Sequence, residues 1–128
     1  MSTIFTKIIN GEIPSYKIAE DENYYAFLDI NPMAEGHTLV VPKKEVDYIF
    51  DLDPETVGGL MQFAQKIAKK IGTVIDCKRV AVVVLGLEVP HAHIHLIPLN
   101  RESDVDFRKP KLKLTPEQFT AIAEKIKL

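Results

Sequence analysis

The chain has 128 residues, enough for one ordinary domain with a single core, and we treat residues 1–128 as one domain. Hydrophobic residues make up 46% and charged residues 27%, values that exclude a disordered, collagen-like or disulfide-rich chain. Sixteen basic residues stand against eighteen acidic ones, and the net charge of -2 argues against nucleic acid as a partner.

The only cysteine is Cys77, which excludes an internal disulfide and a cysteine-based zinc cluster and indicates a reducing compartment. The N-terminal sequence MSTIFTKIINGEIP lacks the basic start and apolar run of a signal peptide. No stretch approaches the roughly 18 apolar residues of a membrane span. We therefore expect a cytoplasmic protein without a membrane partner.

The first half of the chain predicts a short helix followed by three strands of an antiparallel meander. Thr3 can cap the helix, and Glu22-Asn23 forms the tight turn of a hairpin between the first two strands. The β-branched run TLVVP then predicts the third strand. These elements occupy residues 3–9, 16–21, 24–30 and 38–42.

The second half predicts two helices around two strands, which together with the first half gives an α+β fold with an antiparallel sheet. Asp53-Pro54 starts a long amphipathic helix to about residue 75, and Thr115-Pro116 starts a C-terminal helix, with Gln118 completing a capping box. The run KRVAVVVL, residues 78–85, predicts a central strand, and residues 89–97 alternate strictly and predict the last strand.

Three histidines occupy every second position of the run VPHAHIHLI, residues 89–97. Successive side chains of a strand point to opposite faces, so His91, His93 and His95 would project from one face. Ala92, Ile94 and Leu96 would then pack on the other face. With only four histidines in the whole chain, chance is a poor explanation of this row.

The residues alone leave three interpretations of the row open. The histidines could simply face solvent on a half-exposed strand. They could bind a metal ion, although His91 and His95 would lie roughly 13 Å apart, so His93 would need one neighbour and further ligands. Those further ligands could come from Asp29, Glu35, His37 or Glu88. In the third interpretation His93 attacks a phosphoryl group while its neighbours position it or protonate a leaving group.

The motif PHAHIHLIP, residues 90–98, resembles the signature of the histidine triad (HIT) family of nucleotide hydrolases and transferases, in its bacterial type. The segments IFTKIINGEIPSYKI and YYAFLDINPMAEGHTLVVPKK and the long helix match the family in order and spacing. The resemblance covers about residues 4–98 and leaves residues 99–128 as a C-terminal arm and helix. It implies a HIT-like fold.

The resemblance also implies an activity. The middle histidine, His93, attacks the α-phosphate of a nucleoside 5′-phosphoramidate or related purine nucleotide and forms a nucleotidyl-imidazole that water resolves, without a cofactor. His37 would be the fourth histidine beside the triad, and Asp29 would hold the ribose hydroxyls. The residues implied to line the nucleoside pocket are Phe5, Ile8, Ile13, Phe27, Leu28 and Ile30.

Each of these assignments has a plainer alternative. Asp29 begins the sequence DINP, in which aspartate and asparagine commonly bond their own backbone in a turn. Aromatic and aliphatic residues such as those of the implied pocket usually belong to a hydrophobic core. The resemblance further implies a homodimer in which two sheets join across a two-fold axis, with the long helix and the arm after Pro98 as contact surfaces.

The sequence departs from the family pattern in two places. Many relatives carry a glutamine where this chain has Leu87, and the short apolar loop before it makes the phosphate pocket less polar. A nucleotide-binding module with weak catalysis is therefore one alternative function, and the histidine row itself leaves a histidine-ligated metalloprotein as another. Bacterial relatives also bind a structural zinc ion at the positions that here hold Thr3, Thr6 and Glu45, and neutral hydroxyls do not replace thiolates, so we predict no zinc.

Overall fold

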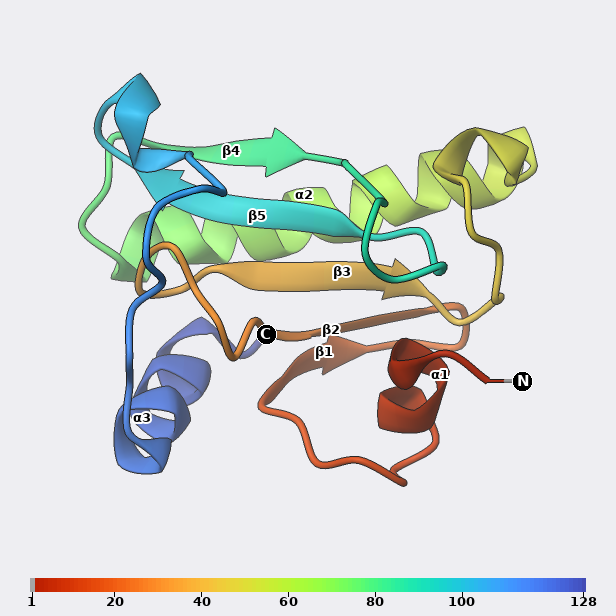
Figure 1. Ribbon diagram of the computed structural model, residues 1–128, viewed down its shortest axis with the longest axis horizontal. Coiled ribbons are helices and arrows are strands. Elements are labelled where there is room, and N and C mark those ends of the chain that lie inside the picture. The colour runs from red at the N-terminus through yellow and green to blue at the C-terminus, as the bar shows by residue number, and fades with distance from the viewer. Residues whose placement is uncertain (1) are drawn as a thin grey trace.

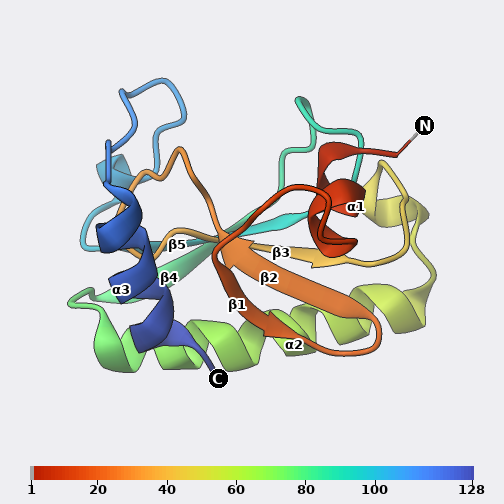
Figure 2. The ribbon, with the colours of Figure 1, turned by 90° about the horizontal axis from the view of Figure 1, so that it is seen from below.

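The computed structural model describes residues 2–128 as a five-stranded antiparallel sheet with helices on both faces (Figure 1). The strand order is β1-β2-β3-β5-β4, and α2 and α3 cover one face while α1 lies on the other (Figure 2). The predicted α+β fold is confirmed. The elements are α1 (Ile4–Ile9), β1 (Lys17–Glu20), β2 (Tyr24–Leu28), β3 (Thr38–Pro42), η1 (Ile49–Asp51), α2 (Pro54–Val74), β4 (Arg79–Val83), β5 (Ile94–Leu99), η2 (Glu102–Asp104) and α3 (Pro116–Ile126).

Each face of the sheet has its own hydrophobic cluster because the side chains of every strand alternate between the faces. The larger cluster packs α2 and α3 against the sheet and contains Leu60, Ile67 and Ile126, all fully buried. On the other face, Phe5 and Ile8 of α1 pack with aromatic and aliphatic side chains of β2 and β3. This second cluster fixes α1 on the face that carries the histidines.

The predicted helix starts are confirmed, because each helix begins at the capping residue expected from the sequence. Thr3 accepts a hydrogen bond from the amide of Thr6, and Asp53 does the same for Thr56. Thr115 forms the predicted capping box with Gln118. No helix within residues 2–128 is long and apolar enough to cross a lipid bilayer.

The prediction that residues 78–85 form a central strand is wrong. The strand β4 is shorter and lies at the edge of the sheet, because β5 pairs with both β3 and β4. The valines that suggested burial on both faces are partly exposed: Val82 is 46% exposed and Val84 lies beyond the last paired residue, Val83.

The prediction of a strand over residues 89–97 is also wrong at both ends. The strand begins at Ile94, so of the three histidines only His95 belongs to β5. The residues before Ile94 do not pair with a strand. The amide of Ala92 instead donates to the carbonyl of Val46, in the loop after β3, at 2.7 Å. The strand continues beyond the predicted end, through Pro98 to Leu99, because β3 pairs only as far as Leu96 and needs no amide from residue 98.

The first hairpin is also shorter than predicted at its ends, although its turn at Glu22-Asn23 is as expected. The carboxylate of Asp21 accepts hydrogen bonds from the amides of Asn23 and Tyr24, both at 2.8 Å. The strand β2 stops at Leu28, which pairs with Thr38, so the end of the predicted run, residues 29–30, lies in a loop.

The two neighbouring glycines of α2 give a matched pair of variants. A methyl group on Gly59 would collide with the hydroxyl of Tyr24, which donates to the carbonyl of Thr56, whereas Gly58 has open space around it. We expect Gly58→Ala to raise the free energy of unfolding by about 1 kcal/mol through helix propensity. Gly59→Ala should lower it by about 1–3 kcal/mol. Urea denaturation measures both, and equal shifts of one sign would contradict the packing described.

Candidate active site

A cavity of about 460 Å³ lies on the α1 face of the sheet, bounded by the loops that follow β2 and β4 and by the C-terminal arm. Its apolar wall comes from α1, β2 and β3, and its polar wall contains His37, His93 and His95. His91 is fully buried and is not part of the lining. The lining includes every residue implied for nucleotide binding: Phe5, Ile8, Ile13, Phe27, Leu28, Asp29 and Ile30.

The loop between β2 and β3 brings Asp29 beside His37. Leu28 and Thr38 are the last paired residues of these antiparallel strands, and the amide of Asp29 donates to the carbonyl of His37 at 3.0 Å. Gly36 has a φ of 94°, a left-handed conformation that favours glycine, immediately before His37. Two residues eight positions apart in the sequence therefore enter the cavity together.

The backbone fixes one ring nitrogen of His93, and the other has no hydrogen-bond partner among residues 2–128. Its Nδ1 lies 2.8 Å from the carbonyl oxygen of His91, and a carbonyl only accepts, so Nδ1 carries the proton. The Nε2 atom then holds a lone pair, and within residues 2–128 it makes no hydrogen bond. Phe5 packs edge-on against the ring at 5.0 Å between centroids and fixes its plane.

His91 is held by two hydrogen bonds that determine its tautomer. Its Nε2 donates to the carbonyl of Pro42 at 2.8 Å, which leaves Nδ1 to accept from the hydroxyl of Thr3 at 2.8 Å. The ring of Phe5 also contacts that of His91. His91 therefore ties the start of α1, the end of β3 and the main chain beside His93 together.

The residues around Thr3 form a hydrogen-bonded network. The carboxylate of Glu45 accepts from the Thr3 amide at 2.8 Å and from the Thr6 hydroxyl at 2.6 Å. Both bonds hold the pKa of Glu45 below its ordinary value, the Thr6 hydroxyl having the larger effect. The hydroxyls act here as hydrogen-bond donors and are not zinc ligands, so this set does not fit a structural zinc ion.

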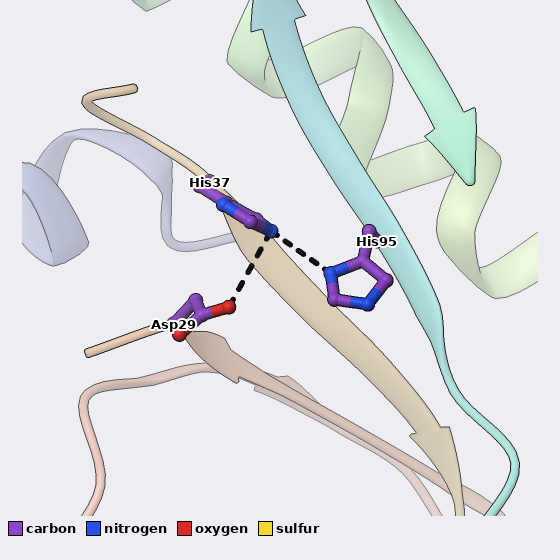
Figure 3. A group of neighbouring side chains, drawn as sticks. All are labelled: Asp29, His37 and His95. Carbon is purple, nitrogen blue, oxygen red and sulfur yellow. Dashed lines mark hydrogen bonds and ion pairs between the residues drawn. The ribbon is translucent and has the colours of Figure 1, made fainter. Parts of the chain in front are cut away.

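His37, His95 and Asp29 form a second connected group (Figure 3). The amide of Met33 donates to His37 Nδ1 at 3.1 Å, so His37 carries its proton on Nε2. That N–H points to His95 Nδ1 at 3.0 Å, with Asp29 Oδ2 at 3.5 Å as a second, longer contact. His95 in turn carries its proton on Nε2 and lines the cavity as a donor.

The same three residues have the composition of a small metal site, with their ligand atoms within 4.8 Å of one another. A metal ion would require a lone pair on His37 Nε2, and the proton would then move to Nδ1. There it would face the amide of Met33, which now donates to that atom. The hydrogen bonds thus favour a chain of imidazole donors over a metal centre.

Burial keeps the histidines of the cavity neutral. It lowers the pKa of His37 to about 3 and that of His95 to about 4, in both cases with a smaller contribution from a neighbouring histidine. Burial also lowers the pKa of His93. The pKa of Asp29 is raised by burial, against a hydrogen bond from the Asn31 amide to Oδ1. That bond shows that Asp29 has the predicted turn role and still directs Oδ2 to His37.

The lining also contains two residues that the sequence had pointed to, Leu87 and Glu88, and two that it had not, Phe107 and Lys111. Leu87 is 91% exposed at the cavity mouth, and Glu88 lies beside it in the same loop. Phe107 and Lys111 come from the C-terminal arm, whose path the sequence did not predict. Their only signal was an aromatic and several basic residues in an otherwise irregular segment.

The hydroxyl of Thr3 can be tested by a pair of substitutions. Thr3→Val removes both the helix cap and the donor to His91, and we expect the free energy of unfolding to fall by about 1–2 kcal/mol. Thr3→Ser keeps both bonds and should remain within about 0.5 kcal/mol of the parent protein. Urea denaturation distinguishes them, and equal stability of the two variants would contradict the network.

The depressed histidine pKa values make stability depend on pH. In the unfolded chain both histidines bind a proton below about pH 6.5. In the folded protein His95 binds one only below about pH 4 and His37 only below about pH 3. Acidification therefore favours the unfolded chain, and the free energy of unfolding falls. Asp29 acts with the opposite sign, because its pKa is raised in the folded state. His37→Gln should reduce the loss of melting temperature between about pH 7 and pH 4.5, measured by calorimetry. An unchanged slope would contradict the burial argument.

Comparisons with known proteins show which family and which solved structures this chain is similar to. Residues 10–102 match the HIT domain. Adenosine 5′-monophosphoramidase of Schizosaccharomyces pombe is 35% identical over 132 residues, covering 98% of this chain and 96% of that protein. A Hit-like protein from Bartonella henselae has a TM-score of 0.86 and 35% identity, covering 98% of this chain and 93% of that chain. A zinc-bound histidine triad protein from Mycobacterium smegmatis has a TM-score of 0.82 and 29% identity, covering 98% and 94%. The chain belongs to the HIT family.

Proposed function

We propose that this protein is a nucleotide-binding hydrolase or transferase that cleaves nucleoside 5′-phosphoramidates or related nucleotides at the α-phosphate through a nucleotidyl-His93 intermediate. The observation that carries the proposal is the hydrogen bond from His93 Nδ1 to the His91 carbonyl at 2.8 Å, which leaves the Nε2 lone pair of a cavity-lining ring available. The name of the relative from Schizosaccharomyces pombe supports the phosphoramidate as substrate class.

The two walls of the cavity suit the two parts of a nucleotide. The purine base lies against the apolar side chains of α1, β2 and β3, and Phe27 and Ile13 supply surface there. Asp29 Oδ2 accepts hydrogen bonds from the ribose hydroxyls, since Oδ1 is already bonded to the Asn31 amide. This arrangement directs the 5′-phosphate toward the histidines.

In the first chemical step the Nε2 lone pair of His93 forms a bond to the α-phosphorus. The phosphoramidate nitrogen takes a proton from water at the cavity mouth, and the P–N bond breaks with its electron pair on that nitrogen, which leaves as an amine. In the second step water attacks the phosphorus and loses a proton, which neutralises the hydroxide left by the first step. The bond to His93 breaks with its electron pair on Nε2, and the nucleoside monophosphate is released. A second nucleophile in place of water would give transfer.

His95 and His91 have different parts in this reaction. His95 Nε2–H donates to the phosphoryl oxygens, where negative charge develops, and His37 keeps His95 in that tautomer. His91 positions His93 through its carbonyl and does not touch the substrate, in agreement with its full burial. No metal or other cofactor takes part in either step.

The protein acts as a homodimer in the cytoplasm under this proposal. Edge strand β4 has no second strand partner within residues 2–128, and Val82 and Val84 are exposed along it. Met61 is exposed on the long helix α2. An unpaired apolar edge favours addition of a strand from a second copy.

A nucleotide-binding module with weak catalysis is the second candidate, and the loop after β4 favours it. Leu85 and Leu87 line the cavity mouth as exposed apolar side chains, so they supply no side-chain donor to the phosphate. A missing donor in a charged transition state costs about 3–4 kcal/mol. In that case the nucleotide binds and turnover is slow.

Incubation with adenosine 5′-phosphoramidate tests the function directly. We expect release of AMP and ammonia, and His93→Ala should lower the rate by about 1,000-fold or more because the nucleophile is lost. His93→Gly with added imidazole should recover part of the activity, because the free base replaces the missing ring.

The control is the circular dichroism spectrum, which should be unchanged in both variants. Binding of AMP without turnover would support the module with weak catalysis. Activity of His93→Ala within about tenfold of the parent protein would contradict the nucleophilic role.

A further inference from the structure

The C-terminal arm forms a third wall of the cavity, although it lies outside residues 4–98, which carry the family resemblance. After β5 the chain passes over the histidine face of the sheet before it reaches α3 (Figure 2). The ring of Phe107 packs edge-on against that of His95 with 5.1 Å between centroids. The amide of Leu112 donates to the carbonyl of Pro32 at 2.9 Å and attaches the arm to the loop that carries Asp29.

Lys111 is held at this wall by its own arm. Its ammonium donates to the carbonyls of Phe107 at 2.8 Å and Lys109 at 3.0 Å, and it lies 5.9 Å from the centroid of the Phe107 ring. An ammonium group has three N–H donors, so one remains for a ligand. These contacts order a side chain that is usually mobile, which reduces the entropy lost on binding.

Lys111 is also the only lysine or arginine in the cavity lining that the structure describes. The acidic lining residues are Asp29 and Glu88. The three histidines of the lining contribute no charge near neutral pH, because burial lowers their pKa values. A phosphate entering the cavity would therefore meet two carboxylates and a single fixed positive charge.

We propose that Lys111 binds the anionic phosphate of the nucleotide, so that the C-terminal arm supplies the positive charge that the histidine wall lacks. The inference rests on the proposed function, since it assigns the phosphate-recognition residue of the same cavity. It distinguishes nucleotides from nucleosides: the apolar wall accepts both, whereas Lys111 favours only the ligand that carries the phosphate.

Binding of AMP and of adenosine, measured by calorimetry on the full chain, separates the charge from the rest of the site. Lys111→Met keeps the aliphatic stem and removes only the ammonium. We expect it to weaken AMP binding by about 10- to 100-fold and to leave adenosine binding within about twofold. Lys111→Arg should retain most of the preference for AMP. Lys113→Met, which changes an exposed lysine of the same arm outside the cavity lining, should bind both ligands as the parent protein does.

The outcomes separate this inference from the function on which it rests. Unchanged AMP binding by Lys111→Met would overturn the role of Lys111 while leaving the proposed function intact. Equal weakening of AMP and adenosine would also overturn it, because the lysine would then only support the fold of the arm. A parent protein that binds neither ligand would contradict the proposed function and this inference with it.

Discussion

The hydrogen bond between His93 Nδ1 and the His91 carbonyl is the interaction on which the candidate site depends. A neutral imidazole has one proton and two nitrogens, and this bond decides which nitrogen keeps the lone pair. The position of the carbonyl depends in turn on the ring of His91, which Thr3 and the Pro42 carbonyl hold from opposite sides. The tautomer of His93, at the cavity, therefore depends on the contacts of His91, which lie outside the cavity.

The network of Thr3, Thr6 and Glu45 occupies the place that the family resemblance assigns to a structural zinc ion. Its members come from the start of α1 and from the chain after β3, and the hydroxyl of Thr3 adds a contact to His91 in a third segment. The hydroxyls and the carboxylate connect the same three segments through hydrogen bonds of 2.6–2.8 Å. Ordinary polar side chains hold the geometry around His91 in this chain, at an energy typical of a few hydrogen bonds.

The sequence predicted what depends on local patterns and missed what depends on pairing between distant segments. The caps Thr3, Asp53 and Thr115 were predicted because a side chain bonds to an amide three residues away. The sequence did not predict that β4 lies at the edge of the sheet, because no residue of KRVAVVVL indicates that β5 pairs with β3. The two-residue alternation did place Ala92, Ile94 and Leu96 in the core opposite the histidine face, even though the strand begins only at Ile94.

The path of the arm was beyond sequence reasoning for a related reason. Its attachment depends on single contacts, such as the amide of Leu112 on the Pro32 carbonyl, that leave no periodic trace in the sequence. The need for the arm follows from the site itself. Burial makes the imidazoles neutral, which gives one of them a lone pair and another a fixed proton, but it also removes their positive charge from a cavity that contains two carboxylates. Under the proposed function, a cation for the phosphate must come from a segment that is itself partly exposed, where an ammonium keeps its charge, and Lys111 of the arm meets that condition.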